Sequence, residues 1–389
     1  SRNAVTSFIP VARISDMLLH PGEPYQYNGH DLLYPDIRLV YWCGGNPFHH
    51  HQDLNRLIRA WSRPETVIVN EIWWTATARR ADIVLPATTT LERDDIGTGF
   101  RDRFIVAMKQ AIPPLGRARN DYDIFADLAE RLGRREAFTE GRDAMAFIRH
   151  IYDEARERAQ ARQMRWPDFD SFWATGYLEI PETPTPHVFL ADFRRDPTGH
   201  KLHTPSGRIE IFSETVASFG YDDCRGHPAW FEPAEWLGGA KAQRYPLHLL
   251  TPQPGTRLHA QMDMGRVSQG SKIAGREPMR INPADAARRG IAEGDIVRVF
   301  NDRGAILAGA VLSDALRPGV IQIATGAWFD PEQPGVVGSL DKHGNPNVLT
   351  LDKGTSRLAQ GPSAQTALVE VEKFVGEPPP LTAFTPPLA

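Results

Sequence analysis

The stretch YWCGGNPFHHHQDLNRL, residues 41–57, combines residue types that can bind an anion. Gly44 and Gly45 follow an apolar run and allow backbone geometry that larger residues avoid. Asn46 and His50 add polar groups beside a predicted helix start, where free N–H groups and the helix dipole attract phosphate. We therefore predict a ligand-holding loop. The alternative is a plain turn with solvated imidazoles.

The same stretch does not predict a metal site or ordinary nicotinamide binding. Side chains of the consecutive histidines His49, His50 and His51 cannot converge on one ion unless the backbone is irregular. Cys43 and Cys224 lie far apart and form no CxxC pair, so we expect no disulfide scaffold and no zinc or iron-sulfur site made by this chain alone. Cys43 could ligate a soft metal, but we expect it to be a small apolar residue of the sheet. The GxGxxG spacing of nicotinamide-binding loops is absent. No nucleophile elbow or recognisable pair of catalytic carboxylates supports hydrolase chemistry.

Two acids, Glu71 and Asp123, could recognise a guanine ring. Each lies at the end or start of a predicted regular element. A carboxylate accepts both N–H groups on one edge of guanine, which adenine does not offer. The alternative is that Asp123 caps its helix and Glu71 is a surface acid.

Two further polar loops add candidate binding groups. LLTPQPGTRLHAQ places several donors within a few residues after a strand, which suits an anion or a polar ring system: Gln253, Arg257, His259 and Gln261. The segment 345–361 is long and polar, and it supplies Asn347 and Gln360. Simple exposure to solvent is the alternative for both loops.

The first third of the chain must position these loops through a βαβ unit. Apolar strands are predicted at 37–43, 66–69 and 81–87, with a helix at 53–61 whose apolar residues recur at helical spacing. Such units form parallel sheets and bind ligands beyond the carboxyl ends of their strands. Further helices are predicted at 121–133 and 143–163, the first capped by Asp121 or Asp123.

Short strands dominate from about residue 245. They include a hairpin around a four-residue loop at 295–312, and Asn282 caps a short helix that starts at Pro283. This pattern predicts a closed antiparallel or mixed barrel. The fold class is therefore α/β plus β, with boundaries 1–110, 111–243 for a loop-rich middle region containing one strand at 203–214, 244–376 for the barrel, and 377–389 for a Pro-rich tail.

Bulk composition narrows the class of protein. The 389 residues carry a formal net charge of -4, which does not indicate a nucleic-acid partner. No apolar run approaches the roughly 18 residues that a membrane span needs. The opening residues SRNAVTSFIP show neither Met nor a signal pattern, so we expect a fragment of a longer protein.

Seven blocks, in this order, resemble the dimethyl sulfoxide reductase family of molybdopterin oxidoreductases: YWCGGNPFHHHQDLNRLIRAW, WTATARRADIVLPATTTLERDDI, RNDYDIFADLAERLG, TPSGRIEIFS, RLHAQ, INPADAARRGIAEGDIVRVFNDRGAILAGAVLSDALRPGVIQI and NPNVLTLDKGTSRLAQGPSAQTALVEVE. The resemblance spans almost the whole chain. It is greatest to the family members that reduce biotin sulfoxide, followed by those that reduce trimethylamine N-oxide and dimethyl sulfoxide.

The resemblance implies a cofactor, Mo-bis(molybdopterin guanine dinucleotide), and reduction of S-oxides or N-oxides by oxygen-atom transfer. Asn46 and His50 would contact one dinucleotide near its phosphates, while Glu71 and Asp123 would accept hydrogen bonds from guanine. Residues lining the pterin side would be Gln253, Arg257, His259, Gln261, Asn347 and Gln360. It also implies a dinucleotide-binding-like α/β region and a barrel of the double-psi type. Two positions depart from the family pattern: Glu71 is often Asp and Gln253 is often His.

The resemblance covers only the carboxyl-terminal half of such an enzyme. The molybdenum-ligand serine and much of the substrate channel would lie in a missing amino-terminal half, which we expect as a partner, and the chain alone would be inactive. Other expected partners are a small sulfoxide or N-oxide and an electron donor, NADPH or a cytochrome. A cytoplasmic location is favoured, with a periplasmic one as the alternative. Rival hypotheses are a non-catalytic cofactor-binding module that needs a partner chain, or a formate dehydrogenase or nitrate reductase.

Overall fold

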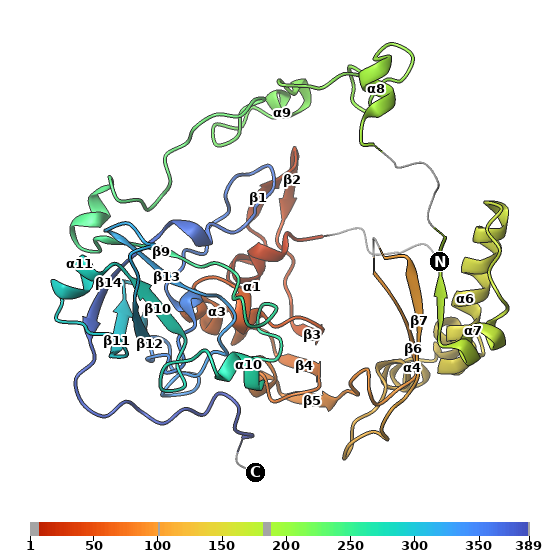
Figure 1. The fold of residues 1–389 in the computed structure, drawn as a ribbon, viewed down its shortest axis with the longest axis horizontal. Helices are drawn as coiled ribbons and strands as arrows, with labels where there is room; N and C mark the ends of the chain where they lie inside the picture. Colours follow the sequence, from red (N-terminus) through yellow and green to blue (C-terminus); the bar gives the residue numbers. More distant parts are fainter. Residues whose placement is uncertain (1–7, 100–101, 182–187, 388–389) are drawn as a thin grey trace. The chain divides into compact units, whose positions relative to one another are not determined.

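The computed structural model describes residues 8–99, 102–181 and 188–387, and it divides into two compact units (Figure 1). The first unit comprises Ser1–Val69, Trp74–Ile83 and Glu210–Ala389. The second comprises Asn70–Trp73 and Val84–Ile209. The candidate loops around Gly44, His259 and Gln360 therefore all belong to the first unit.

The predicted βαβ pattern is present. Strand β3 (Leu39–Cys43) is followed by α2 (Pro47–His50) and α3 (Leu54–Trp61), and then by β4 (Thr66–Glu71) and β5 (Ile83–Pro86), in the sheet order β3-β4-β5. The Asp82 N–H donates to the Val67 carbonyl at 2.9 Å, and the Ala87 N–H to the Glu71 carbonyl at 3.1 Å. The residue numbers rise together along β4 and β5, so these two strands are parallel.

Helix α3 combines a cap that was not predicted with the apolar stripe that was. The side chain of Asp53 accepts a hydrogen bond from the Arg56 N–H and so caps the first turn. Its apolar stripe is buried, as predicted: Leu54, Leu57, Ile58 and Trp61. The helix thus fixes the far side of the loop that starts at Gly44.

The carboxyl-terminal strands close into a six-stranded barrel of order β10-β12-β11-β14-β9-β13. Two pairs, β10 with β12 and β13 with β9, are parallel and the other four are antiparallel, so the barrel is mixed. Its strands are β9 (Leu247–Leu250), β10 (Pro278–Ile281), β11 (Ile296–Phe300), β12 (Ala305–Leu312), β13 (Val320–Ile323) and β14 (Ala367–Lys373). The predicted closed barrel is confirmed, although β10 was not foreseen.

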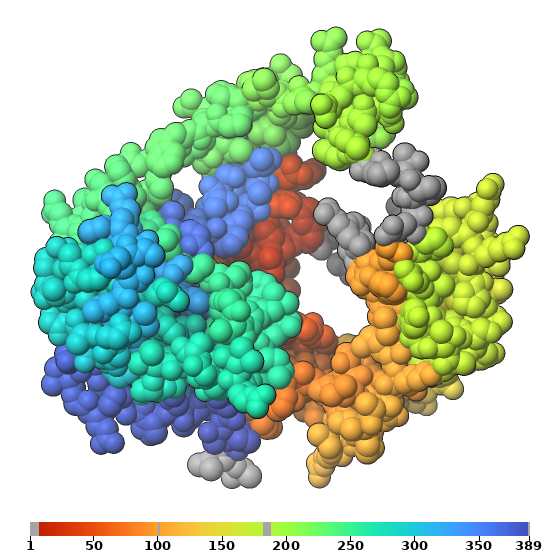
Figure 2. Space-filling view, in the orientation of Figure 1, coloured from red at the N-terminus to blue at the C-terminus, as the bar shows by residue number. Residues whose placement is uncertain are grey.

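Apolar side chains fill this barrel, and strand β12 is buried on both of its faces along most of its length. The apolar side chains with no solvent exposure include Leu249, Met279, Ile281, Val297, Val299, Ile306 and Leu307. Figure 2 shows the barrel segments, in cyan and blue, closely packed on the face in view. The predicted hairpin joins β11 and β12 through residues 301–304, and Asn282 caps α11 (Pro283–Ala287) as expected. A barrel this well filled provides a rigid base for the loops that leave it.

The remaining elements of the first unit are short. They are η1 (Val11–Arg13), α1 (Ile14–Leu19), the antiparallel pair β1 (Pro24–Tyr27) and β2 (His30–Leu33), η2 (Ala78–Arg80), α9 (Glu214–Ser218), η3 (Ala240–Gln243), α10 (Arg266–Gln269), η4 (Pro346–Val348) and η5 (Ala364–Thr366). Neither Cys43 nor Cys224 forms a disulfide bond.

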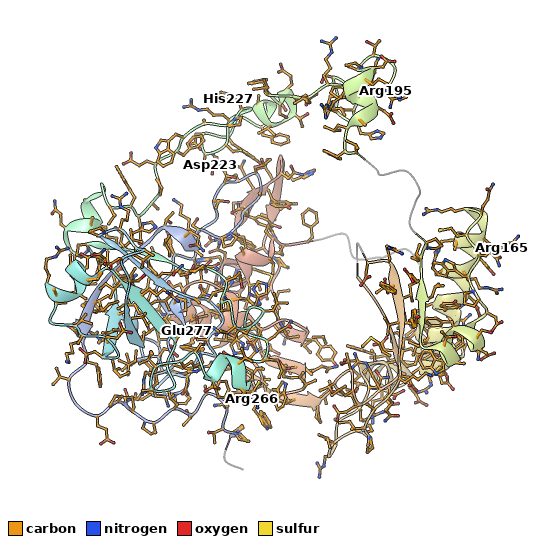
Figure 3. The ribbon with its side chains drawn as sticks, in the orientation of Figure 1. Arg165, Arg195, Asp223, His227, Arg266 and Glu277 are labelled. Atoms are coloured by element: carbon orange, nitrogen blue, oxygen red, sulfur yellow. The ribbon has the colours of Figure 1, made fainter. Side chains whose placement is uncertain are left out.

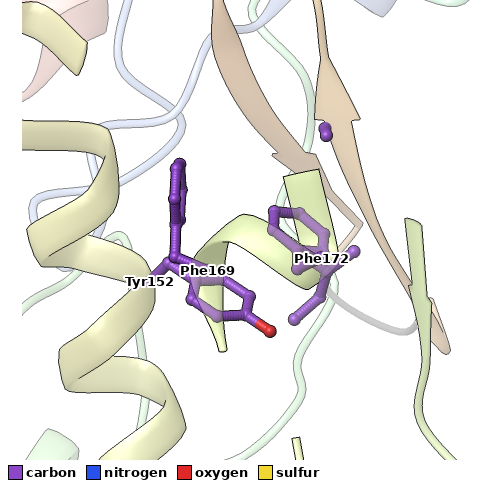
Figure 4. Packing of buried hydrophobic residues seen from close by; sticks show 5 residues of the cluster. Tyr152, Phe169 and Phe172 are labelled. Atoms are coloured by element: carbon purple, nitrogen blue, oxygen red, sulfur yellow. The ribbon is translucent and has the colours of Figure 1, made fainter. Parts of the chain in front are cut away.

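The second unit combines an antiparallel sheet with helices. Strands β6 (Asp95–Thr98), β7 (Phe104–Met108) and β8 (Tyr177–Glu179) pair in that order. The helices are α4 (Asp121–Arg131), α5 (Arg135–Thr139), α6 (Ala144–Ala161), α7 (Phe169–Thr175) and α8 (Ala191–Arg195). Rings from α6 and α7 meet strand β7 in one core, with Tyr152 and Phe172 stacked at 4.4 Å between ring centroids (Figure 4).

Two local predictions were wrong. Helix α4 is capped by Asn120, whose side chain accepts from the Tyr122 N–H, and not by Asp121 or Asp123. The predicted strand within 203–214 is absent, and Ile211 is 82% exposed. The alternating pattern R-I-E-I-F suits a strand, but a strand also needs a partner, and pairing is a tertiary matter. None of the helices in the described part of the chain is long and apolar enough to cross a membrane.

Candidate functional site

The loop after β3 has the open backbone that its sequence predicted. Gly44 and Gly45 have φ values of 71° and 69°, in the left-handed region that favours glycine, and both are exposed. A Cβ on Gly44 would meet no atom within 4 Å. The space beside these amides is therefore open to a ligand.

Asn46 has one side-chain donor without a hydrogen-bond partner in the described part of the chain. Its residue is 8% exposed, its Oδ1 accepts from the Thr77 hydroxyl, and its backbone N–H donates to His50 Nε2 at 3.3 Å. The Nδ2 atom is buried and has no hydrogen-bond partner among the described residues. Because a buried amide without a partner is costly, this donor fits a ligand that supplies an acceptor.

His50 is held neutral at this position. The residue is exposed in part, and desolvation by the surrounding protein lowers its pKa to about 4. His51 and His259 add smaller contributions in the same direction. Since Nε2 accepts from the Asn46 N–H, the ring carries its proton on Nδ1. Trp328, which stacks on His49 and donates to the Ala260 carbonyl, joins the RLHAQ loop to the GGNPFHHH loop.

The segment 345–350 supports the GGNPFHHH loop through hydrogen bonds to its backbone. Asn347 Nδ2 donates to the His49 carbonyl and Asn345 Nδ2 to the Phe48 carbonyl, both at 3.3 Å. Thr350 Oγ1 donates to Asn347 Oδ1 at 3.0 Å. Asn347 is 3% exposed, so its side chain braces the loop and its amide is already engaged by protein.

The loop after β9 divides into exposed and enclosed residues. Gln253, His259 and Gln261 are exposed, as expected for residues that meet a ligand. Arg257 has no exposed side-chain area and donates only to groups within the protein. This burial does not support direct ligand contact by Arg257 and gives it a supporting position.

The other predicted residue of the last loop, Gln360, is tied to the β1–β2 hairpin. Its Nε2 donates to the Gln26 carbonyl at 2.8 Å, and its φ is 53°. Nearby, the carboxylate of Asp352 is 1% exposed and accepts from Arg56 at 2.8 Å, Arg13 at 3.1 Å and His51 at 3.3 Å. These contacts fix the 351–361 segment against η1 and α3.

Glu71 and Asp123 both belong to the second unit. Asn70 Nδ2 donates to Asp121 Oδ1 at 2.9 Å, which places the end of β4 beside the start of α4. Glu71 Oε1 accepts from the Ile72 N–H. Asp123 is exposed and lines two cavities of about 410 and 460 Å³. Its carboxylate is thus accessible to a ligand.

Sequence reasoning missed the groups that lie behind the GGNPFHHH loop. The Arg80 guanidinium packs 4.5 Å from the Phe48 ring centroid and 4.9 Å from that of Phe329, and burial lowers its pKa to about 10. The Trp328 ring stacks on His49 with 5.0 Å between centroids, and burial lowers the His49 pKa to about 3. Nothing in the local sequence marks Arg80 or Trp328, because their neighbours come from distant segments.

The structure therefore brings three candidate loops of the first unit together, whereas Gln360 is bonded to the β1–β2 hairpin. The loops that carry Asn46, His259 and Asn347 contact one another through His49, His50 and Trp328. The open glycines, the unpaired Asn46 amide and the exposed side chains fit a long polar ligand with acceptor groups. Among the described residues, no three His, Cys, Asp or Glu side chains are grouped as a metal would require.

Comparison with known protein families identifies the class. Residues 26–131 match the family described as Molybdopterin oxidoreductase, and residues 247–368 match the Molydopterin dinucleotide binding domain. Both matches include candidate loops of the first unit. The chain belongs to the molybdopterin oxidoreductase family, and the two matches support a molybdopterin cofactor.

Individual relatives refine this placement. The chain is 54% identical to the dimethyl sulfoxide/trimethylamine N-oxide reductase of Cereibacter sphaeroides over 100% of its own length and 47% of that relative. It is 54% identical to the biotin sulfoxide reductase of the same organism (96% of this chain, 50% of the relative) and 48% identical to the trimethylamine-N-oxide reductase of Haemophilus influenzae (98% and 47%). The chain spans about half the length of the curated relatives it matches.

A solved structure shows a similar fold. Acetylene hydratase from Pelobacter acetylenicus aligns with a TM-score of 0.66 at 20% identity, covering 88% of this chain and 45% of that one. At this identity the likeness concerns the fold alone.

Proposed function

We propose that this chain forms part of a molybdenum enzyme that reduces S-oxides or N-oxides, such as biotin, methionine or dimethyl sulfoxide or trimethylamine N-oxide. The observation that carries the proposal is the convergence of the loops of Asn46, His259 and Asn347, with an unpaired buried donor on Asn46. The 54% identity to two such reductases over nearly the whole chain supports the substrate class.

The cofactor we propose is Mo-bis(molybdopterin guanine dinucleotide). When bound, the molybdenum centre supplies the oxygen-atom transfer and two-electron chemistry. In this chain, the amides of Gly44 and Gly45 and the side chains of Asn46 and His50 would hold phosphate oxygens.

The pterin side would be met by residues of the barrel loops. The exposed side chains that would contact it are Gln253, His259 and Gln261. Asn347, Gln360 and Arg257 would fix the loops around it, because their polar groups are already engaged by protein.

Glu71 and Asp123 would bind guanine. An exposed carboxylate that accepts both N1–H and N2–H discriminates guanine from adenine, because adenine presents no matching donor pair. Glu71 carries one methylene more than the Asp usual in the family, and it keeps the same acceptor atoms.

The protein residues also set the protonation of the site. His50 stays neutral near pH 7 because its pKa is about 4, so it provides one N–H donor and one acceptor and no charge. Gln253 in place of the usual His likewise adds a donor without charge. Attraction of an anionic ligand would then depend on backbone amides and on the buried charge of Arg80.

We further propose a division into a dinucleotide-binding-like region (1–110), a mixed region (111–243), a double-psi barrel that binds the dinucleotide (244–376) and a Pro-rich tail (377–389). Activity would require the amino-terminal half that carries the molybdenum-ligand serine, together with an electron donor, NADPH or a cytochrome. Without that half the chain would be inactive. A cytoplasmic location is part of the same proposal.

The proposal can be tested by cofactor content in a complementation experiment. The chain is co-expressed with an amino-terminal half from the Cereibacter sphaeroides biotin sulfoxide reductase, and molybdenum, pterin and sulfoxide reduction are measured. We expect all three with the wild-type chain and a large loss of pterin with Asn46→Ala. The control is Asn282→Ala, which removes a helix cap outside the candidate loops. Equal pterin in Asn46→Ala and the wild type would contradict the assignment of Asn46.

A further inference from the structure

Four charged side chains are enclosed together beneath the RLHAQ loop: Arg257, Asp263, Lys272 and Glu277 (Glu277 is labelled in Figure 3). Three of them have no exposed side-chain area, and Glu277 is 4% exposed. The Lys272 ammonium lies 3.0 Å from Asp263 and 2.8 Å from Glu277. The Arg257 guanidinium lies 3.5 Å and 3.2 Å from the same two carboxylates. The two cations and two anions form a neutral group.

Such a group is not explained by stability alone. Removing charges from water costs free energy, and well-packed apolar residues often replace a buried ion pair without loss. These ion pairs also fix the directions in which the hydrogen-bond donors of Arg257 point. The contacts of Arg257 show which groups those donors reach.

The donors of Arg257 converge on the loop backbone. Its Nε–H donates to the His259 carbonyl at 3.1 Å, and Nη2 donates to the Thr325 carbonyl at 3.0 Å. Its Nη1 donates to Ser268 Oγ at 3.1 Å, and that hydroxyl in turn donates to Asp263 at 2.8 Å. Because guanidinium is planar and rigid, these bonds set the position of the His259 backbone.

His259 is clamped from a second side. A Cβ on Gly326, whose φ is +94°, would clash with the His259 carbonyl, so only glycine allows this approach. The Trp328 indole donates to the neighbouring Ala260 carbonyl at 2.9 Å, and the Trp328 N–H donates to Asp263. His259 itself has a φ of 51°, which is uncommon for a residue other than glycine and persists only where surroundings impose it.

We propose that Arg257, fixed by Asp263, Lys272 and Glu277, is a positioning residue that holds His259 in its left-handed conformation and presents its exposed ring to the pterin side of the ligand. The identity of that ligand rests on the proposed function. The geometric part does not, because it concerns only the chain's own backbone and the His259 ring.

The test is nuclear magnetic resonance of the full chain labelled with ¹³C,¹⁵N-histidine, with the His259 signals assigned by their loss in His259→Gln. Arg257→Lys keeps the positive charge but loses the planar guanidinium group. Gly326→Ala adds a Cβ that would clash with the His259 carbonyl. Ser268→Ala is a mild third variant that removes one acceptor of Arg257. Arg289→Lys is the matched control, because Arg289 also pairs with a carboxylate, Glu370, and donates to a backbone carbonyl, outside this loop.

We expect displaced or broadened His259 signals in Arg257→Lys, Gly326→Ala and Ser268→Ala, and unchanged ones in Arg289→Lys. The positioning role would be overturned if the His259 signals of Ser268→Ala coincided with those of the wild type, and if the same held for every folded variant at Arg257 and Gly326. Pterin content of the same variants in the complemented protein separates the two proposals. Displaced His259 signals with undiminished pterin would confirm the positioning and refute the contact of His259 with the cofactor.

Discussion

Two aspartates illustrate opposite ways of using a carboxylate in this chain. Asp263, in the first unit, has no exposed side-chain area and contacts Lys272, Arg257 and Ser268. Asp123, in the second unit, is exposed and lines two open cavities. The difference separates groups that shape a binding loop from groups that are free to bind, although both are acids near proposed ligand sites.

Removal of the buried negative charge of Asp263 should have the largest effect on the free energy of unfolding. Asp263→Asn leaves Arg257 and Lys272 enclosed with one anion fewer, so we expect a loss of about 3–5 kcal/mol in the free energy of unfolding. Asp123→Asn should change it by no more than about 0.5 kcal/mol. Urea denaturation of both variants measures the difference, and similar losses in the two would contradict the comparison.

The burial of His49 also predicts that the free energy of unfolding depends on pH. The His49 pKa is about 3 in the folded chain against an ordinary 6.5, so the unfolded chain binds a proton first as pH falls. The stability contribution of the neutral ring is complete above pH 6.5 and is lost progressively toward pH 3. In His49→Gln, the slope of unfolding free energy against pH between about pH 6 and 4 should fall by up to about 1.4 kcal/mol per pH unit.

The check is urea denaturation of wild type and His49→Gln at several pH values. The reference range is about pH 7 to 8, where His49 is neutral in the folded and the unfolded chain. Identical slopes in the two proteins would argue against a buried neutral ring.

Asn347 tests whether the last loop braces the first. Asn347→Ala leaves the buried His49 carbonyl and the Thr350 hydroxyl without this partner, and we expect a loss of about 1–3 kcal/mol in the free energy of unfolding. Hydrogen exchange should accelerate at residues 46–51. The control is Asn282→Ala, because Asn282 also bonds to backbone groups but lies at the start of α11. Unaltered exchange at 46–51 in Asn347→Ala would show that the brace is dispensable.

Asp123→Ala should have the smallest effect on stability and a clear effect on binding. Loss of a charge-assisted hydrogen bond, about 1.5–3 kcal/mol, corresponds to roughly a tenfold to hundredfold weaker affinity for guanosine diphosphate, used as the probe. Equilibrium dialysis measures it, with adenosine diphosphate as the control ligand. Unchanged guanosine diphosphate affinity would remove Asp123 from the proposed guanine site.

Much of the local architecture could be read from residue patterns. The stripe of α3, the hairpin of β11 and β12 and the Asn282 cap depend on nearby neighbours in the chain, so periodicity and capping chemistry predicted them. The strand expected within 203–214 failed because an alternating pattern specifies a strand only if another strand is available to pair with it.

The candidate site shows the same division. Asn46, His50, His259 and Gln261 could be singled out because several polar groups gather within a few residues after a strand or beside a glycine turn. The support that Asn347 gives to the distant His49, and the enclosure of Arg257, could not be inferred from composition.

Residue type and local spacing were enough to predict candidate ligand-binding segments, because open turns, helix caps and donors are made by neighbours in the chain. Which polar residues face outward, and which support them from within, was settled by the assembled fold. The charge of a side chain is a local property, whereas its burial and its partners depend on segments that the whole fold brings together, as Asp263 and Asp123 show.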